Sequence, residues 1–433
     1  MLAASLFELS PAGEITFWNI AVSLAVSSSC ALIGCYLVLR RMSLLGDAIS
    51  HAVLPGLVIG FMISGSRDLT PMLIGAVAAG LLTAYLTEVL FRRARIDADA
   101  SMGVVFTTLF SIGVILITLY HSQVDLDPGC VLYGQLEASA IDTRPLFGVE
   151  LPRQLPPLLV VLAAVVLFLV AFWKELKITS FDPAMATTLG MSAGVIHYLL
   201  MTMVACTTVA CFEAVGSILV IAMLIVPGAT AHLLTDRLGP FVVTALVVSW
   251  IAAVGGYLGA DALDLNAAGS ITVALGIVFF VVAIAAPKHG IAVRWLRTAL
   301  LSLRIAQEDI LARLYRYQER EYDPAHAPTE ASGGPKVAPA IRFLATRTLL
   351  WSRWLQRQGG VVQLTERGTN RARELIRSHR VWESYARENL DLPLDHLHAS
   401  AHRVEHFITP ELASEIREGL ADPERDPHGR EIP

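Results

Sequence analysis

Two pairs of residues near the C-terminal end have the spacing of metal ligands. His402 and His406 are four residues apart, with Glu405 beside the second. His379 and Glu383 are also four apart. Residues with this spacing share one face of a helix, so each pair would present nitrogen and oxygen donors suited to a divalent transition metal. Half of the chain's 12 histidines lie in this region: His379, His396, His398, His402, His406 and His428. This density predicts metal binding; a solvated helical face with incidental histidines is the alternative.

A third pair lies in an apolar stretch. The segment GDAISHAVLPG places Asp47 and His51 four residues apart, hence on one helical face. Ionisable groups inside a membrane are costly and usually mark a substrate or proton path. A carboxylate and an imidazole on adjacent turns can jointly hold a divalent ion, and Pro55 would loosen the helix beside them. The alternative is that Asp47 caps a helix and His51 is a satisfied core histidine.

The elements that carry these residues belong to two chemically different parts of the chain. Hydrophobic residues make up 54% and charged residues only 16% of the sequence, outside the range of a soluble globular protein. From Lys288 onward charged residues become frequent. In the part before Lys288, spans can be recognised by length, because a helix needs roughly 20 apolar residues to cross a bilayer. Nine stretches qualify as spans: residues 17–39, 42–64, 70–91, 102–121, 156–173, 194–212, 216–235, 239–259 and 268–287.

These patterns predict an all-α membrane protein with about nine transmembrane helices. We expect a transmembrane domain over residues 1–287, then an amphipathic helix and a Pro/Gly-rich linker over 288–340. A mainly α cytosolic domain follows over 341–433. Lys and Arg favour cytoplasmic loops, and with nine spans the basic loops fall on one side. The protein would therefore cross the inner (plasma) membrane several times, with its spans in contact with membrane lipid. The N-terminus is then outside, and the C-terminal domain lies in the cytoplasm.

Between the fifth and sixth spans lies a segment too polar to cross the bilayer. Asp182 suits a helix cap, Pro183 suits the first turn, and Gly190 after Leu189 suits the end of a short helix. A helix on the cytoplasmic face is what a membrane subunit needs in order to be moved by a soluble motor. A loop without a partner is the alternative.

Residues 15–290 resemble the permease subunits of ABC transporters that import manganese, zinc or iron. The stretches that carry the resemblance are LVLRRMSLLGDAISHAVLPG, SFDPAMATTLGMSAG and VGSILVIAMLIVPGATA. The resemblance implies a pore made with a second copy or a related permease, and an extracytoplasmic metal-binding protein that delivers the ion. It also implies a cytosolic ABC ATPase dimer docking near Asp182 to Gly190, and an ion path lined by Asp47 and His51.

The chain contains no G-x-x-x-x-G-K-[ST] phosphate loop. ATP would therefore act only through the partner ATPase. No residue pattern indicates a nucleophile or an acid/base pair, so we expect a permease subunit rather than an enzyme.

The stretch from QLTERG to the closing DPHGREIP resembles the metal-binding and dimerisation domain of iron- and manganese-dependent repressors. By position, the resemblance implies one metal site from His379, Glu383 and His398. It implies a second site from His402, Glu405 and His406, where His402 departs from the usual Cys or Glu. The segment QGGVVQLTERG resembles a winged-helix wing, but the preceding IRFLATRTLLWSRWLQ is apolar where a recognition helix should be polar. The winged helix is thus degenerate, and DNA is not an expected partner.

These features favour a metal-importing ABC permease whose cytosolic domain senses the metal and regulates transport. Donors of the O/N type favour manganese, while imidazole also suits zinc and iron. One alternative is a membrane-tethered, metal-dependent transcriptional regulator, which predicts salt-dependent DNA binding. Another is a proton-driven secondary transporter that uses Asp47 and His51 and needs no ATPase.

Overall fold

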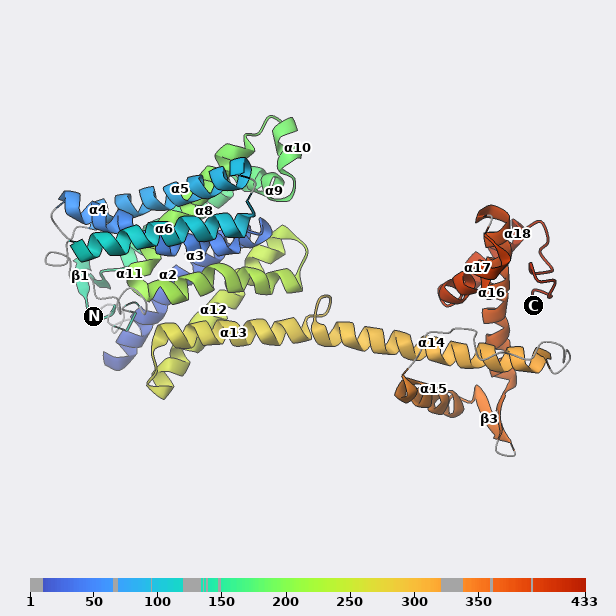
Figure 1. The fold of residues 1–433 in the computed structure, drawn as a ribbon. Coiled ribbons are helices and arrows are strands. Elements are labelled where there is room, and N and C mark those ends of the chain that lie inside the picture. Colours follow the sequence, from blue (N-terminus) through green and yellow to red (C-terminus); the bar gives the residue numbers. More distant parts are fainter. Residues whose placement is uncertain are drawn as a thin grey trace. The chain divides into compact units, whose positions relative to one another are not determined.

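The computed structural model describes residues 11–64, 69–94, 96–119, 134, 136–137, 139–146, 149–320, 338–358, 361–390 and 392–433. The chain divides into two compact units, Met1–Val293 and Arg294–Pro433. Helices dominate both units (Figure 1). Helix α14 (Ile291–Arg320), which lies in the predicted connecting segment, falls almost entirely in the second unit.

The first unit is a bundle of apolar helices. Among the described residues, eight spans are long and apolar enough to cross a membrane, and there are up to nine if the bent pair α8 and α9 forms one span. This confirms the predicted all-α membrane fold. The helices are α2 (Pro11–Leu39), α3 (Ser43–Ala52), α4 (Leu54–Ser64), α5 (Leu69–Ala94), α6 (Ala98–Leu119), α8 (Leu155–Ala171), α9 (Trp173–Phe181), α10 (Pro183–Thr188), α11 (Ala193–Leu234), α12 (Leu238–Leu263) and α13 (Ala267–Ala285).

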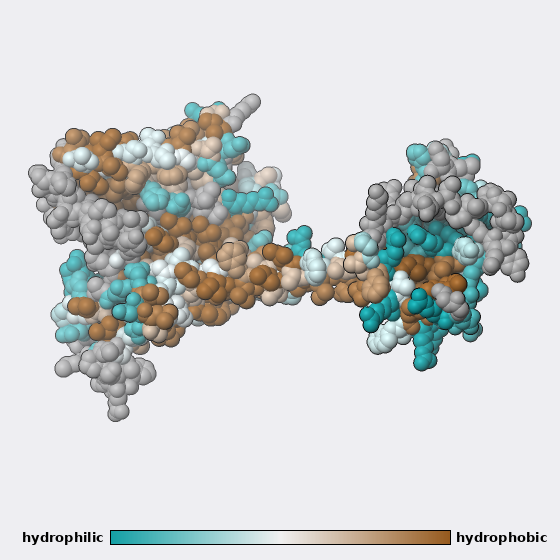
Figure 2. Space-filling view, turned by 60° about the horizontal axis from the view of Figure 1, so that its bottom comes forward, coloured by the Kyte–Doolittle hydropathy of each residue, from teal (hydrophilic) through white to brown (hydrophobic). Residues whose placement is uncertain are grey.

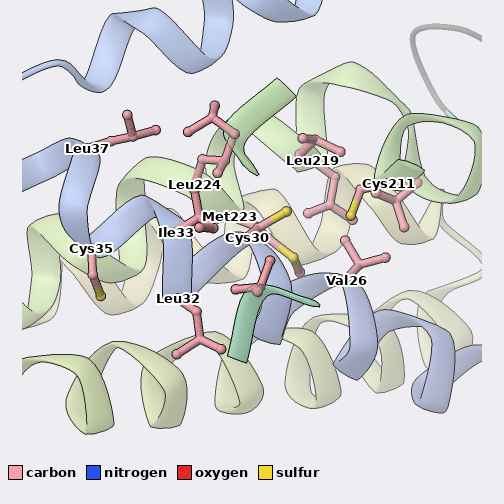
Figure 3. Close-up of a cluster of buried hydrophobic side chains, with 14 of the residues drawn as sticks. Val26, Cys30, Leu32, Ile33, Cys35, Leu37, Cys211, Leu219, Met223 and Leu224 are labelled. Atoms are coloured by element: carbon pink, nitrogen blue, oxygen red, sulfur yellow. The ribbon is translucent and has the colours of Figure 1, made fainter. Parts of the chain in front are cut away.

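Helix α2 forms the core of the bundle together with α11. The two helices approach so closely that a side chain at Gly34 would collide with the backbone of Leu224. Small residues at such contacts are how membrane helices gain packing energy, since lipid supplies no hydrophobic drive between them. Figure 3 shows the buried side chains that fill this contact, among them Val26, Cys30, Ile33, Cys211, Leu219 and Met223.

Polar side chains tie α2 to other parts of the bundle. Asn19 donates a hydrogen bond to the Tyr257 hydroxyl (2.9 Å) and accepts one from Ser139 (2.8 Å). At the other end of α2, Arg40 donates to the Thr179 hydroxyl of α9 (2.7 Å). Buried polar groups of this kind need partners, so these bonds fix where α2 meets its neighbours.

The outward surface of the bundle is apolar. Val160 and Leu167 of α8 and Phe280 of α13 are each more than 60% exposed. Figure 2 shows hydrophobic side chains spread over this part of the chain. Such a surface would be unfavourable in water and is appropriate to lipid.

Several helices are interrupted where a span would otherwise be continuous. The predicted second span is broken into α3 and α4 at Val53, next to Pro55, because proline cannot donate the helical hydrogen bond. Helix α11 contains two candidate spans, Ala193–Phe212 and Ala214–Leu234, and is kinked near the start of the second at Gly216, whose φ of 76° favours glycine. Helices α8 and α9 are bent by 73° relative to one another. A short antiparallel hairpin, β1 (Thr143–Leu146) and β2 (Val149–Pro152), was not foreseen.

The second unit combines a small hydrophobic core with a two-stranded hairpin. Its elements are α14, α15 (Pro339–Trp351), β3 (Leu355–Gln358), β4 (Val361–Leu364), α16 (Glu366–Leu390), α17 (Leu394–Val404) and α18 (Pro410–Glu418). Leu311 of α14, Leu349 of α15 and Ala372 of α16 share a buried cluster with both strands. The antiparallel β3–β4 pair lies where the sequence predicts a wing.

Adjacent glycines in α12 offer a matched test of this packing. A side chain at Gly256 would lie 2.5 Å from Ile271 Cα of α13, whereas one at Gly255 would meet nothing within 4 Å. Gly256→Ala should therefore lower the stability of the purified protein by about 1–3 kcal/mol through overpacking. Gly255→Ala should be neutral or slightly stabilising. Thermal unfolding in detergent measures both, and equal behaviour of the two variants would contradict the described contact between α12 and α13.

Candidate metal sites

Donor groups from two distant parts of the chain meet in the second unit. Asp309 of α14 and three residues at the end of α17, His402, Glu405 and His406, offer ligand atoms that all lie within 4.8 Å of one another. The four-residue spacing puts both histidines on one face, as predicted, and α14 packs opposite them. The result is a set of two imidazoles and two carboxylates, which suits a divalent transition metal.

Glu405 joins the two ligand groups that the sequence treats as separate. Its carboxylate accepts hydrogen bonds from His402 Nδ1 (2.8 Å) and from His379 Nδ1 of α16 (2.5 Å). His379 Nε2 in turn donates to Glu383 (3.1 Å). His379, Glu383 and Glu405 are all buried. The predicted ligands therefore form one connected network, except that the side chain of His398 lies outside the described residues.

Two acidic residues of α14 were missed by the sequence reading. Asp309 Oδ1 lies 3.4 Å from His406 Nε2, and Glu308 accepts a hydrogen bond from His406 Nδ1 (2.9 Å). Glu308 also pairs with Arg371 of α16 at 2.8 Å. The available signal was the adjacent Glu308–Asp309 pair inside a helix with more basic than acidic residues, but nothing local connects it with residues about a hundred positions later.

The network shifts the ionisation of its members. Burial alone would raise the pKa of Glu405, but hydrogen bonds from His379 and His402, together with the Arg316 charge, lower it to about 2. Burial would lower the pKa of His406, but Asp309 and Glu308 outweigh that effect and raise it to about 9. The pKa of His379 is raised in the same way by Glu383 and Glu405.

The donor set fits a metal ion on an independent ground. Asp309 Oδ1, His402 Nε2 and His406 Nε2 are buried and make no hydrogen bond of ordinary geometry with the described residues, and Asp309 Oδ1 meets the two imidazoles only as ion pairs at 3.4 and 3.9 Å. Buried polar atoms are nearly always satisfied, and an orphan calls for an explanation such as an ion or a water. Here the three orphaned atoms belong to the same compact group. A divalent ion bound there would satisfy all of them at once.

In the membrane unit, Asp47 and His51 of α3, the candidate ion-path pair, lie close together, while their role stays a prediction. His51 Nε2 lies 3.3 Å from Asp47 Oδ1, and each side chain is a little over one-third exposed. The imidazole also lies beside the rings of Phe106 and Phe110 on α6. The two donors thus stand together at the break between α3 and α4, so they are placed to share an ion.

The segment predicted to form a short helix does so as α10. Asp182 accepts a hydrogen bond from the Met185 amide (2.9 Å), and Pro183 occupies the first turn. Leu189 closes the helix with its side chain 55% exposed, and Gly190 follows with φ of 79°. This exposed apolar tip is available to a partner, although the role of these residues stays a prediction.

Comparison with known proteins identifies both parts of the chain. Residues 12–286 match the ABC 3 transport family, and residues 365–433 match the iron dependent repressor, metal binding and dimerisation domain. Because the first match covers more than half of its length, the chain belongs to the ABC 3 transport family and is an integral membrane transport permease. Both resemblances noted in the sequence are thereby confirmed.

Several individual proteins are similar over most of their own length. The manganese transport system membrane protein MntD of Bacillus subtilis is 44% identical over 65% of this chain and 95% of its own. The zinc transport system membrane protein TroD of Treponema pallidum is 37% identical over 83% of this chain and 98% of its own. The structure of PsaBC from Streptococcus pneumoniae in complex with Fab matches with a TM-score of 0.55 and 31% identity, covering 65% of this chain and 94% of that one.

The position of Asp309 predicts that α14 contributes a metal ligand. Asp309→Asn keeps the size of the side chain but removes its charge, so we expect Mn²⁺ affinity at this site to fall at least tenfold. Calorimetric titration of the full-length protein in detergent measures this. Glu415→Gln, an exposed carboxylate of α18 in the same unit, is the matched control. Equal affinities in the two variants would exclude Asp309 as a ligand.

The raised pKa of His406 predicts that metal binding depends on pH. With a pKa of about 9, the metal-free imidazole is protonated at pH 7, and an ion can bond only to its neutral form. Affinity should therefore increase up to about tenfold per pH unit from pH 7 and level off above pH 9, with release of about one proton. Titrations in buffers of different ionisation enthalpy count that proton. Affinity that stays constant between pH 7 and 9 would contradict the assignment.

Proposed function

We propose that this chain is the permease subunit of an ATP-driven importer of a divalent metal, and that its C-terminal unit binds the same kind of metal and regulates transport. The observation that carries the proposal is the group of orphaned donors in Asp309, His402 and His406. They occur in one chain with a permease that has its own carboxylate–imidazole pair.

Manganese is the metal that we favour. Both candidate sites offer carboxylate oxygens and imidazole nitrogens without thiolates, and such donors suit manganese, while zinc and iron(II) accept them too. The relatives described above are named for manganese and zinc transport. Asp47 and His51 would hold the ion in transit, and Asp309, His402, Glu405 and His406 would hold the regulatory ion. His379, Glu383 and His398 would support or extend that second site.

The partners follow from the family to which the chain belongs. Permeases of this kind work with an ATPase and with a substrate-binding protein outside the membrane. We assign the basic ends of the spans to the cytoplasm, which puts α10 and the C-terminal unit on that side. Asp182, Pro183, Leu189 and Gly190 then shape the surface on which the ATPase dimer docks, and a second permease completes the pore.

Regulation is proposed to work as feedback. A divalent ion would bond to α14 and to the end of α17 together, and would replace the proton on His406. Occupancy at high internal metal would therefore fix the second unit in one arrangement and favour an idle transporter.

The feedback proposal predicts a metal response that can be removed without removing transport. In proteoliposomes containing the complete transporter, Mn²⁺ inside should slow Mn²⁺ uptake several-fold in the wild type. In the His402→Ala/His406→Ala double variant, the ratio of rates with and without internal Mn²⁺ should approach one, because two of the donors are lost.

The control for this experiment is His396→Ala, an exposed histidine on the same helix. It should retain the response of the wild type. A double variant that still responds like the wild type would remove the regulatory part of the proposal, while the permease part would stand.

A further inference from the structure

A second carboxylate–imidazole pair lies between two spans of the membrane unit. Glu88 of α5 and His197 of α11, here called the inner pair, approach with Oε2 and Nε2 3.7 Å apart. Their side chains are only 16% and 19% exposed. Ionisable groups inside membrane spans are costly, and they generally mark the path of an ion or a proton.

The packing of three helices relates the inner pair to the ion-path pair. A side chain at Gly80 of α5 would lie 2.8 Å from Ala205 Cβ of α11 and 3.3 Å from Ile49 Cγ2 of α3. Ile49 lies between the two residues of the ion-path pair in the sequence. The three helices therefore meet at the level of the ion-path pair.

From this contact the inner pair lies further along both helices. Glu88 is eight residues beyond Gly80, and His197 is eight residues before Ala205. Because α5 and α11 run antiparallel here, both steps lead toward the same end of the bundle. Eight helical residues span about 12 Å. The two pairs thus follow one another along the bundle axis, with the inner pair nearer the ends at Ala94 and Ala193.

The geometry of the inner pair is close to that of two ligands of one ion. Donors that each bond to a transition metal at about 2.1 Å stand roughly 3.0–3.4 Å apart. The distances in the two pairs are 3.3 and 3.7 Å, so a shift of a few tenths of an ångström would suffice. Both pairs consist of one carboxylate and one imidazole, and an ion would meet the same chemistry twice.

We propose that Glu88 and His197 form a second, transient binding site for the transported divalent ion, on the exit side of Asp47 and His51. An ion leaving the first pair exchanges one carboxylate and imidazole for another about 12 Å further along. It therefore finds protein ligands of the same kind a second time before it leaves the bundle. This inference rests on the proposed function, since it assumes that the permease carries such an ion inward.

Uptake measurements test the inner pair in the complete transporter. Proteoliposomes with the ATPase, the binding protein and the permease are assayed with Mn²⁺, Zn²⁺ and Fe²⁺ in turn. Glu88→Gln and His197→Gln retain hydrogen-bonding capacity but weaken metal ligation. We expect at least tenfold slower uptake of the carried ion in each variant, with a melting temperature like that of the wild type.

A cysteine variant separates a ligand from a purely structural ion pair. His197→Cys replaces imidazole with a soft thiolate, which binds Cd²⁺ strongly. Inhibition of uptake by Cd²⁺ should then require at least tenfold less Cd²⁺ than in the wild type. Val195→Cys, 56% exposed on the same helix, is the control and should behave like the wild type.

The proposal is overturned if both Gln variants transport at the wild-type rate. It is also overturned if uptake falls together with the melting temperature while His197→Cys shows no gain in Cd²⁺ sensitivity, because the pair is then structural. Failure of the proposed function itself gives a different result. In that case the wild-type transporter takes up none of the three ions, and both proposals fall.

Discussion

Burying a polar atom without a partner costs about 1–3 kcal/mol, and this constraint determines where the chain can place its ligands. In the membrane unit some buried polar atoms are paired, as in the contact of Asn19 with Tyr257, while others, such as the Tyr36 hydroxyl, have no hydrogen-bond partner among the described residues. In the second unit the atoms without a hydrogen-bond partner among the described residues include Asp309 Oδ1, His402 Nε2 and His406 Nε2. Three such atoms within one small group are explained most simply by an ion that binds them all.

Charge balance explains how that group is held together before an ion binds. Glu308 and Glu405 are both buried, and isolated buried carboxylates would be far too costly. Arg371 pairs with Glu308 at 2.8 Å, and Arg316 lies 3.6 Å from Glu405. The remaining negative charge is offset by protons on histidines. A divalent ion that displaces the proton of His406 changes the net charge of the site by only about one unit.

The sequence predicted features that depend on neighbouring residues. Apolar runs predicted the spans, and Asp182 with Pro183 predicted the start of α10. The four-residue spacing of Asp47 and His51 predicted that their side chains lie together on one helical face. It could not give contacts that join distant helices. Asp309 precedes His402 by about ninety residues, and Glu88 precedes His197 by more than a hundred. No periodicity relates such positions, because the helical repeat only defines a face and tertiary packing decides what that face meets.

Helix α14 has a particular place in this arrangement because of where it occurs in the chain. It begins at Ile291, shortly after the last span ends at Ala285, and it carries Asp309. The other ligands lie at the end of α17. Without an ion, α14 is joined to α16 and α17 by pairs such as Glu308 with Arg371 and His406. An ion bonded to both sides would add direct ligand bonds to those contacts. If the proposed site binds metal, the element that the ion would restrain is thus the helix that follows the membrane unit in the chain.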